Sequence, residues 1–215
     1  TLDLSNLYLD VLKDRLYTFP AASPSRRSAQ SACFSILDSL TRLMAPVLSF
    51  LAEEVWDHLP GAKAGSVHQA LFPQGLERYL DEALAERYEK LLAIRSETTV
   101  ALERARAEKK IGNALDALVY WRPPAGEEEF YAANLASLIE LSLVSDGRLG
   151  EIDPAEAAAV QPSEKLSGLV VGVAVHGGPK CPRCWMRSET IGQDADHPQV
   201  CARCAGHLKE AAANQ

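Results

Sequence analysis

Two cysteine pairs near the end of the chain constrain the fold more than any other feature of the sequence. Cys181 and Cys184 form the first C-x-x-C pair, and Cys201 and Cys204 form the second after sixteen intervening residues. The two-residue gap lets both sulfurs of a pair turn toward one cation, and two pairs complete the tetrahedral shell of structural zinc. Because the protein fills all four positions, we expect the metal to fold this tail rather than to catalyse.

Two other chemistries could use the same cysteines. Paired disulfides suit oxidising compartments and small secreted folds. Four thiolates also bind iron, as in rubredoxin-like sites, although the ribbon-like spacing favours zinc. The fifth cysteine, Cys33, lies in an apolar helical pattern and is predicted to be a buried thiol. Four cysteines spaced for a metal and one left over fit a reducing cytosol.

The charge of the chain is acidic overall but basic near the cysteines. The formal net charge is −7 at pH 7, which by itself argues against a nucleic-acid partner. The cations near the cysteine pairs are Lys180, Arg183, Arg187 and Arg203. They either balance the negative charge of four thiolates or contact phosphate groups, and the sequence leaves both interpretations open.

The first half of the sequence predicts long amphipathic helices. Apolar residues recur at helical spacing over residues 4–17, 23–59 and 79–108. The second helix begins at Ser23 and Pro24, and Pro46 breaks or kinks it. Its apolar stripe is predicted to be core, from Cys33 through Leu43 and Val47 to Trp56. Tyr8, Tyr17 and Tyr88 are also predicted to face inward.

The pattern changes beyond Gly112. Strands are predicted at 117–121, 141–144 and 169–175, with a helix at 127–139. Residues 146–166 are predicted to be a loop with a short helix at 154–160. The predicted fold class is therefore α+β and mostly α. It comprises a helical bundle over 1–110, a small α/β unit over 111–176 and a zinc-binding tail over 177–215.

Motifs for other chemistry are missing from the sequence. There is no glycine-rich phosphate loop, and no recognisable set of nucleophile and base, so no catalytic residue is predicted. No apolar run reaches membrane-spanning length, and we expect no signal peptide. The sequence begins inside a helical pattern, which we interpret as the start of a fragment. These features favour a binding module over an enzyme.

Three stretches resemble one family. Residues 7–17 and 43–56, with Arg26 and Arg27 between them, resemble the anticodon-binding bundle of class I aminoacyl-tRNA synthetases. Residues 108–117 resemble the segment that follows this bundle in isoleucyl-tRNA synthetases. The two cysteine pairs, with Trp185 after the first, resemble the C-terminal zinc motif of the bacterial isoleucyl enzymes. The sequence departs from the family where Ser49 replaces a frequent proline and Met186 a frequent histidine.

The resemblance implies the C-terminal portion of a ligase that joins isoleucine to its tRNA with ATP. The catalytic and editing domains of such an enzyme are not in this sequence, so the chain should be inactive alone. The implied partners are the anticodon stem-loop of isoleucine tRNA and the remaining domains of the polypeptide. The implied cofactor is one structural zinc ion, with ATP used only by the full-length enzyme. We expect a cytoplasmic protein, a monomer without membrane contact.

The resemblance also directs attention to residues that could touch RNA. RNA loops are bound by stacking bases on aromatic or guanidinium planes, with cations on the phosphates. Trp185 is the predicted stacking residue, although it could instead pack against the metal loop. The candidate cations are Arg183, Arg203, Lys13, Arg15, Arg26 and Arg27. Each of them could equally be an ordinary surface or ion-paired side chain.

A function of a different class is also compatible with the sequence. A zinc-ribbon protein-interaction module on a helical scaffold would have no role in RNA binding, and its Arg and Trp residues would be structural. Salt dependence separates the two functions, because phosphate binding weakens steeply as salt rises and an apolar protein interface does not.

Overall fold

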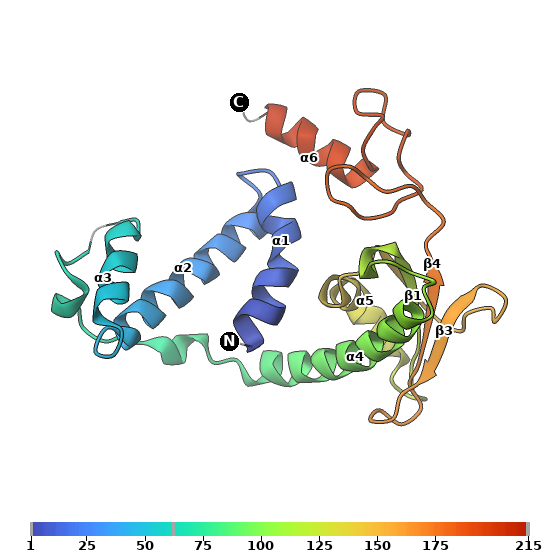
Figure 1. The fold of residues 1–215 in the computed structure, drawn as a ribbon, viewed down its shortest axis with the longest axis horizontal. Coiled ribbons are helices and arrows are strands. Elements are labelled where there is room, and N and C mark those ends of the chain that lie inside the picture. The colour runs from blue at the N-terminus through green and yellow to red at the C-terminus, as the bar shows by residue number, and fades with distance from the viewer. Residues whose placement is uncertain (1, 62, 214–215) are drawn as a thin grey trace. The chain divides into compact units, whose positions relative to one another are not determined.

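The computed structural model describes residues 2–61 and 63–213 of the chain. These residues form two compact units (Figure 1). One unit combines the chain up to Thr18 with the chain from Ala83 onward, and the other runs from Phe19 to Glu82. The fold is α+β and mostly helical, which confirms the predicted fold class. None of the described helices combines the length and apolarity that crossing a bilayer requires.

The first unit contains a four-stranded mixed sheet with the strand order β2-β1-β4-β3. Its strands are β1 (Ala117–Arg122), β2 (Asp146–Leu149), β3 (Ala157–Pro162) and β4 (Val170–Val175). β1 is parallel to β2 and antiparallel to β4, and β3 is antiparallel to β4. Because a parallel pair needs a crossover connection, α5 (Glu128–Ser142) joins β1 to β2.

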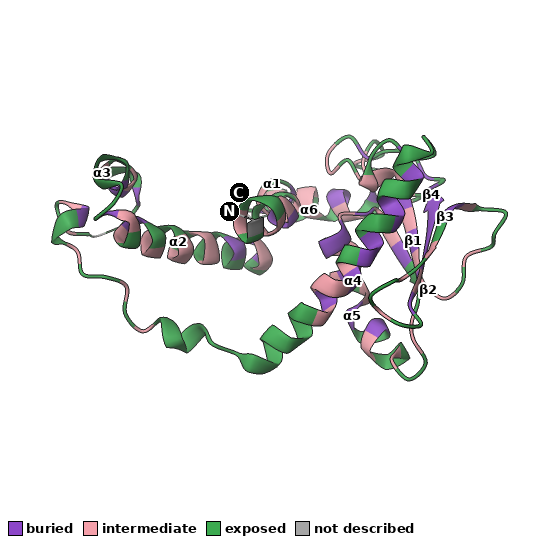
Figure 2. Cartoon of the chain, turned by 60° about the horizontal axis from the view of Figure 1, so that its bottom comes forward, coloured by how far each residue is buried: buried purple, intermediate pink, exposed green. Residues whose placement is uncertain are grey.

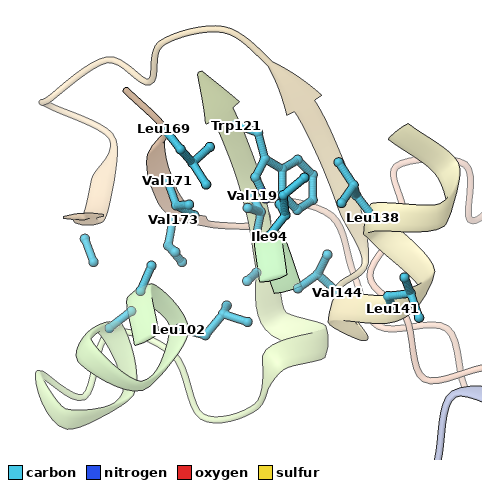
Figure 3. Packing of buried hydrophobic residues seen from close by; sticks show 14 of the residues in the cluster. Ile94, Leu102, Val119, Trp121, Leu138, Leu141, Val144, Leu169, Val171 and Val173 are labelled. Carbon is cyan, nitrogen blue, oxygen red and sulfur yellow. The ribbon is translucent and has the colours of Figure 1, made fainter. Parts of the chain in front are cut away.

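One face of this sheet carries the main core. Alternate residues of a strand point to the same face, and on β1 and β4 these are Val119, Trp121, Val171 and Val173, all fully buried. They pack against α4 (Glu82–Ala107) and α5, as Ile94, Leu102 and Leu138 illustrate in Figure 3. Trp121 Nε1 donates a 2.8 Å hydrogen bond to Thr98 Oγ1 of α4, so the one polar atom of this ring is satisfied inside the core.

Helices also form the two ends of this unit. π-helical turns at Leu2–Tyr8 lead into α1 (Leu9–Thr18), which confirms the predicted first helix. α6 (Ala202–Ala213) begins within the second cysteine pair and was not predicted as a helix. A short 3₁₀ turn, Ala114–Asp116, precedes β1 and is closed by a capping box between Asn113 and Asp116.

The second unit consists of α2 (Pro24–Met44), α3 (Ser49–His58) and short 3₁₀ turns at Val67–Gln69 and Leu76–Tyr79. Pro46 lies between the two helices, where the sequence predicted a break. A small core holds this unit together, and Trp56 at its centre donates from Nε1 to the Ala64 carbonyl at 2.9 Å. The other buried members are Ala45, Ala52, Leu59 and Val67.

The prediction that the whole apolar stripe of this region is core was wrong. Trp56 is 2% exposed, but Leu43 is 52% and Val47 is 82% exposed, and Cys33 is only half-buried. Figure 2 shows few buried residues on α2 and α3, in contrast to the sheet. Helical periodicity identifies the apolar face of a helix, but it does not say what covers that face. Among the described residues of this unit, the turn after α3 covers only a small part of the apolar faces of α2 and α3.

Other sequence predictions also need correction. Residues 141–144 are not a strand, because α5 continues to Ser142 and Leu143 ends it in a left-handed conformation. Residues 146–166 are not a loop with a helix, since they contain β2 and β3. A short apolar run such as 141–144 fits a helix end as well as a strand. Tyr17 and Tyr88 are exposed rather than buried. The predicted strands at 117–121 and 169–175 are confirmed.

Candidate metal centre

The first cysteine pair lies in a tight backbone turn. Lys180 pairs with Arg187 across an isolated bridge, and Cys181 N–H donates to the Met186 carbonyl at 2.8 Å. Trp185 N–H donates to the Cys181 carbonyl at 2.9 Å. Trp185 itself has φ = 65°, a left-handed conformation that favours glycine. The chain thereby reverses within a few residues and turns the sulfurs of Cys181 and Cys184 the same way.

The second pair is positioned by the start of α6. Ala205 N–H donates to the Cys201 carbonyl at 2.9 Å, so Cys201 directly precedes that helix and Cys204 lies in its first turn. The Cys201 N–H points to the Cys181 sulfur at 3.5 Å, which links the two pairs directly. Cys181, Cys201 and Cys204 are buried, and Cys184 is half-buried.

The four sulfurs have the geometry that a zinc ion requires. They all lie within 4.8 Å of one another, and Cys184 Sγ is 3.8 Å from Cys201 Sγ. A tetrahedral site with Zn–S bonds of about 2.3 Å has sulfurs about 3.8 Å apart. Four soft donors without a fifth position, three of them buried, fit a closed structural zinc site, and the donor set is wrong for magnesium or calcium.

The protonation of the thiols supports the same interpretation. Burial raises the pKa of Cys184 and Cys204, and the negative charge of the Cys201 sulfur raises the pKa of both further. Burial acts in the same direction on Cys181, but backbone N–H groups of Cys184, Cys201 and Arg183 outweigh it and lower the pKa to about 6. Four thiolates at these distances repel one another unless a cation lies between them. Zinc would supply that charge.

The metal loop is fixed by polar contacts to the segments that directly precede β1 and β2. Arg187 Nε donates to Asp116 Oδ1 at 2.7 Å, and the Arg187 N–H donates to Ser145 Oγ at 2.7 Å. The Arg187 side chain holds the pKa of the Asp116 carboxyl below its usual value, with burial acting in the opposite direction. The approach is close at Gly178, where an added Cβ would lie 2.6 Å from the Ser188 backbone carbon.

The same tail also contacts α1. Arg203 Nη1 and Nη2 donate to the two carboxylate oxygens of Asp14 at 2.5 and 2.9 Å. On the same helix, Arg15 forms a second bidentate pair with Glu140 of α5, with both bonds at 2.6 Å. These are planar fork-to-fork pairs, the strongest geometry available to an arginine. α1 is therefore bonded both to α5 and to the metal tail.

The structure places the predicted RNA-contacting residues in different settings. Trp185 is 63% exposed, beside the metal loop rather than packed beneath it, and Lys180 Nζ lies 5.6 Å from its ring centroid. Arg183 is half-buried against Cys204, where it opposes the effect of burial on the thiol pKa. Lys13 is exposed and pairs with Asp10 at 2.6 Å. In the second unit, Arg26 donates to the Phe19 carbonyl at 3.0 Å and Arg27 is exposed.

Two residues of this site were not predicted from the sequence. Asp14 binds Arg203, and Asp116 binds Arg187, across separations of 189 and 71 residues. Both carboxylates lie on helical segments where an acidic residue is ordinary. The capping-box spacing of Asn113 and Asp116 is the one local signal, and it predicts a turn rather than a contact to the metal loop.

Comparison with known proteins gives one family match for the N-terminal half of the chain and another for the region of the four cysteines. Residues 1–120 match the family described as the anticodon-binding domain of tRNA ligases, and residues 178–205 match the zinc finger found in FPG and IleRS. Because the first match covers more than half of its length, the chain belongs to the tRNA ligase anticodon-binding family. The match to the zinc finger spans all four cysteines.

The similar individual proteins include several isoleucine–tRNA ligases. The isoleucine–tRNA ligase of Moorella thermoacetica is 44% identical over 213 residues, which cover 97% of this chain and 23% of that protein. The isoleucine–tRNA ligases of Geobacter sulfurreducens and Caldanaerobacter subterraneus are 42% and 45% identical, each over 97% of this chain and 22% of their own length. The chain thus spans less than a quarter of the relatives that it matches.

Proposed function

We propose that this chain is the tRNA-binding, C-terminal portion of an isoleucine–tRNA ligase. It would hold the anticodon stem-loop of isoleucine tRNA while parts of the enzyme outside residues 1–215 use ATP to attach the amino acid. The observation that carries this proposal is the family match over residues 1–120, together with similarity to isoleucine–tRNA ligases over nearly the whole chain. The protein would act as a monomer in the cytoplasm.

The three predicted regions would divide this work. Residues 1–110 would receive the anticodon stem, residues 111–176 would form the junction, and residues 177–215 would form the metal-binding tail. We propose that Cys181, Cys184, Cys201 and Cys204 hold one zinc ion, which is supported by their sulfur spacing and by the zinc-finger match. When bound, the ion supplies structural cross-linking and neutralises thiolate charge.

Trp185 is the residue that we propose to stack on an anticodon base. A large aromatic ring that stays 63% exposed beside a rigid metal loop is available to a base, and Lys180 above it is available to the adjoining phosphate. Arg183, Arg203, Lys13, Arg15, Arg26 and Arg27 remain proposed phosphate contacts. Arg27 and Lys13 are the more accessible of them, whereas Arg15 and Arg203 already hold carboxylates.

The test is a binding titration of the zinc-loaded chain. Isoleucine tRNA and the same tRNA with an altered anticodon are titrated at two salt concentrations. We expect tighter binding to the natural anticodon, with an affinity that falls steeply as salt rises. Equal binding to both tRNAs would contradict anticodon recognition by this chain. Binding that is absent or insensitive to salt would contradict the proposed tRNA binding and would favour a zinc-ribbon protein-interaction module.

Variants of Trp185 make the test specific to the proposed stacking. Replacing Trp185 by Ala should weaken binding by about 1–3 kcal/mol, the usual contribution of one stacked base. Trp185→Phe should retain most of the affinity, because it keeps an aromatic plane. Equal affinities of all three proteins for the natural tRNA would remove Trp185 from the interface.

A further inference from the structure

Arg203 lies between a carboxylate of α1 and the candidate metal centre. Its guanidinium donates to both carboxylate oxygens of Asp14, at 2.5 and 2.9 Å. The same side chain lies close to Cys184, one of the four candidate ligands, and its Nη2 lies 3.3 Å from Met186 Sδ. One half-buried cation therefore contacts a candidate metal ligand on one side and α1 on the other.

This arrangement makes Asp14 part of the outer shell of the metal centre. Groups that hydrogen-bond to metal ligands orient them and adjust their basicity, and the partners of those groups orient them in turn. Without Asp14, Arg203 would keep its charge but lose the acceptor that fixes its plane. Its orientation beside the Cys184 sulfur would then become one of several competing orientations.

A second contact from the tail also holds α1. His207 of α6 lies against the backbone of Thr18, at the end of α1. Asp14 also accepts a hydrogen bond from Thr18 Oγ1 at 3.0 Å, so the two contacts lie on neighbouring turns. Both depend on the position of α6, which follows Cys201 directly and carries Cys204 in its first turn. The metal that would fix these cysteines would thereby also fix the surface on which α1 lies.

We propose that Asp14 and Arg203 couple the metal centre to the docking of α1. Zinc binding stabilises the docked helix, and the docked helix raises the affinity for zinc by the same factor, because linkage is reciprocal. The proposal rests on the zinc binding proposed above and is independent of RNA binding. It assigns to Asp14 and Arg203 a positioning role that extends from the second cysteine pair to α1.

The first test measures zinc affinity by competition with a chromophoric chelator. Asp14→Asn removes the charge and keeps the size of the side chain. Outer-shell partners typically contribute 10- to 100-fold to metal affinity, and we expect a loss of about tenfold here. The matched control is Asp10→Asn, one turn earlier on the same helix, where the carboxylate pairs with exposed Lys13 instead. That control should bind zinc like the wild type.

The second test measures amide hydrogen exchange of residues 9–18 with and without zinc. In the wild-type chain, zinc should slow exchange in α1, although none of the four cysteines is on that helix. In Asp14→Asn this dependence on zinc should disappear, and Asp14→Glu should restore part of it. An ion pair with a merely structural role would change the exchange rates of α1 equally in both metal states. The wild-type comparison requires no variant to fold.

The outcomes separate the two proposals. A wild-type chain that takes up no zinc overturns the metal centre and the coupling together. A chain that binds zinc, but in which Asp14→Asn has wild-type zinc affinity and α1 exchanges independently of zinc, overturns the coupling alone. A loss of zinc affinity in Asp14→Asn but not in Asp10→Asn, together with zinc-dependent exchange in α1, supports it.

Discussion

At the scale of single residues, Trp185 combines an unfavourable backbone with an exposed ring. Its φ of 65° places a bulky side chain where glycine is usual, and a left-handed conformation costs a non-glycine residue roughly 1–2 kcal/mol. Because the ring is mostly exposed, burial of the side chain offsets little of this free energy cost. Strain of this kind is often retained where a side chain has a function.

Replacing Trp185 by glycine should therefore separate folding from binding. We expect Trp185→Gly to retain zinc and to unfold at the same or a slightly higher temperature. The free energy of unfolding should rise by up to about 1 kcal/mol, because the backbone strain is relieved. Its tRNA affinity should fall as far as that of Trp185→Ala. Thermal unfolding and tRNA titration check the two expectations. A variant that loses both zinc and stability would show that the ring is needed for the fold.

A second residue-scale prediction concerns the carboxylate of Asp116. Its pKa is lowered mainly by the hydrogen bond from Arg187, so it stabilises the fold above its unfolded pKa of about 3.9. That contribution is lost as the pH falls through the lower, folded pKa. Asp116→Asn should cost about 1 kcal/mol near neutral pH, and the difference from wild type should shrink below pH ~4.

The measurement is chemical denaturation of both proteins over a pH series. Both proteins are expected to lose metal in acid, so the quantity compared is the difference between them at each pH. Asp57→Asn, at an exposed aspartate of α3, serves as the control and should track the wild type throughout. A cost for Asp116→Asn that stays constant down to low pH would argue against the ion pair.

At the scale of structural elements, the chain entering the metal loop at Gly178 is packed tightly against the chain leaving it at Ser188 and Glu189. An added Cβ at Gly178 would lie 2.6 Å from the Ser188 carbonyl carbon and 2.9 Å from the Glu189 nitrogen. Both are backbone atoms, so they cannot move away as a side-chain end would. An added Cβ at Gly177, the preceding residue, meets nothing within 4 Å.

These neighbouring glycines form a matched pair for mutation. Gly178→Ala should destabilise the tail by about 1–3 kcal/mol, as overpacking typically does, and should speed zinc release to a chelator. Gly177→Ala should behave like the wild type. The rate of zinc transfer to a chromophoric chelator measures both. If the two variants released zinc equally fast, the close approach would not be limiting.

Removal of the metal should affect one set of elements much more than the rest. We expect chelation to unfold residues from about 177 onward, including α6, because the four thiolates have no other reason to converge. Among the described residues, the core of α4, α5 and the sheet contains no cysteine ligand, so it should persist. Circular dichroism should show a small loss of helix. A loss of most of the helical signal would contradict a separable tail.

The elements differ in how well the sequence predicts them. β1 and β4 were predicted correctly because they are apolar runs bounded by turn residues, and α4 because of its helical periodicity. β2 and β3 were missed, since Asp146–Leu149 is largely polar and Ala157–Pro162 is rich in alanine, a poor strand former. These strands exist because β1 and β4 offer unpaired backbone edges, which no local pattern reveals.

At the scale of the whole molecule, the second unit leaves much of its apolar surface uncovered. Val47 and Phe50 are 82% and 93% exposed, next to the buried Trp56 of the same unit. Large exposed apolar side chains of this kind promote association where they lie together. The amphipathic stripe was recognised from the sequence, but its burial could not be, because burial depends on partners far along the chain or outside it.

Serine substitutions on this surface test how much it contributes to stability. We expect Val47→Ser and Phe50→Ser to leave the unfolding free energy within about 0.5 kcal/mol and to raise solubility. Trp56→Ala, in the buried core of the same unit, should cost about 3–5 kcal/mol. Chemical denaturation and light scattering measure the two effects. A large destabilisation by either serine would show that the surface is buried in solution.

The candidate site was predictable in the same uneven way. The spacing of the four cysteines is enough to predict a metal centre, because two C-x-x-C pairs have few other uses. The exposure of Trp185 and the bonds from Arg187 and Arg203 could not be predicted. They depend on which carboxylates the fold brings near, and Asp14 and Asp116 come from distant parts of the sequence.

The pairing of Asp14 with Arg203 also sets an order of events during synthesis. The two residues are separated by 189 positions, and a ribosome that adds about 5–20 residues per second needs roughly 10–40 s to bridge them. During that interval α5 is synthesised and can hold α1 through Glu140, but the tail that carries Arg203 has not yet been made. The contact between α1 and the tail can therefore form only after the second cysteine pair has left the ribosome.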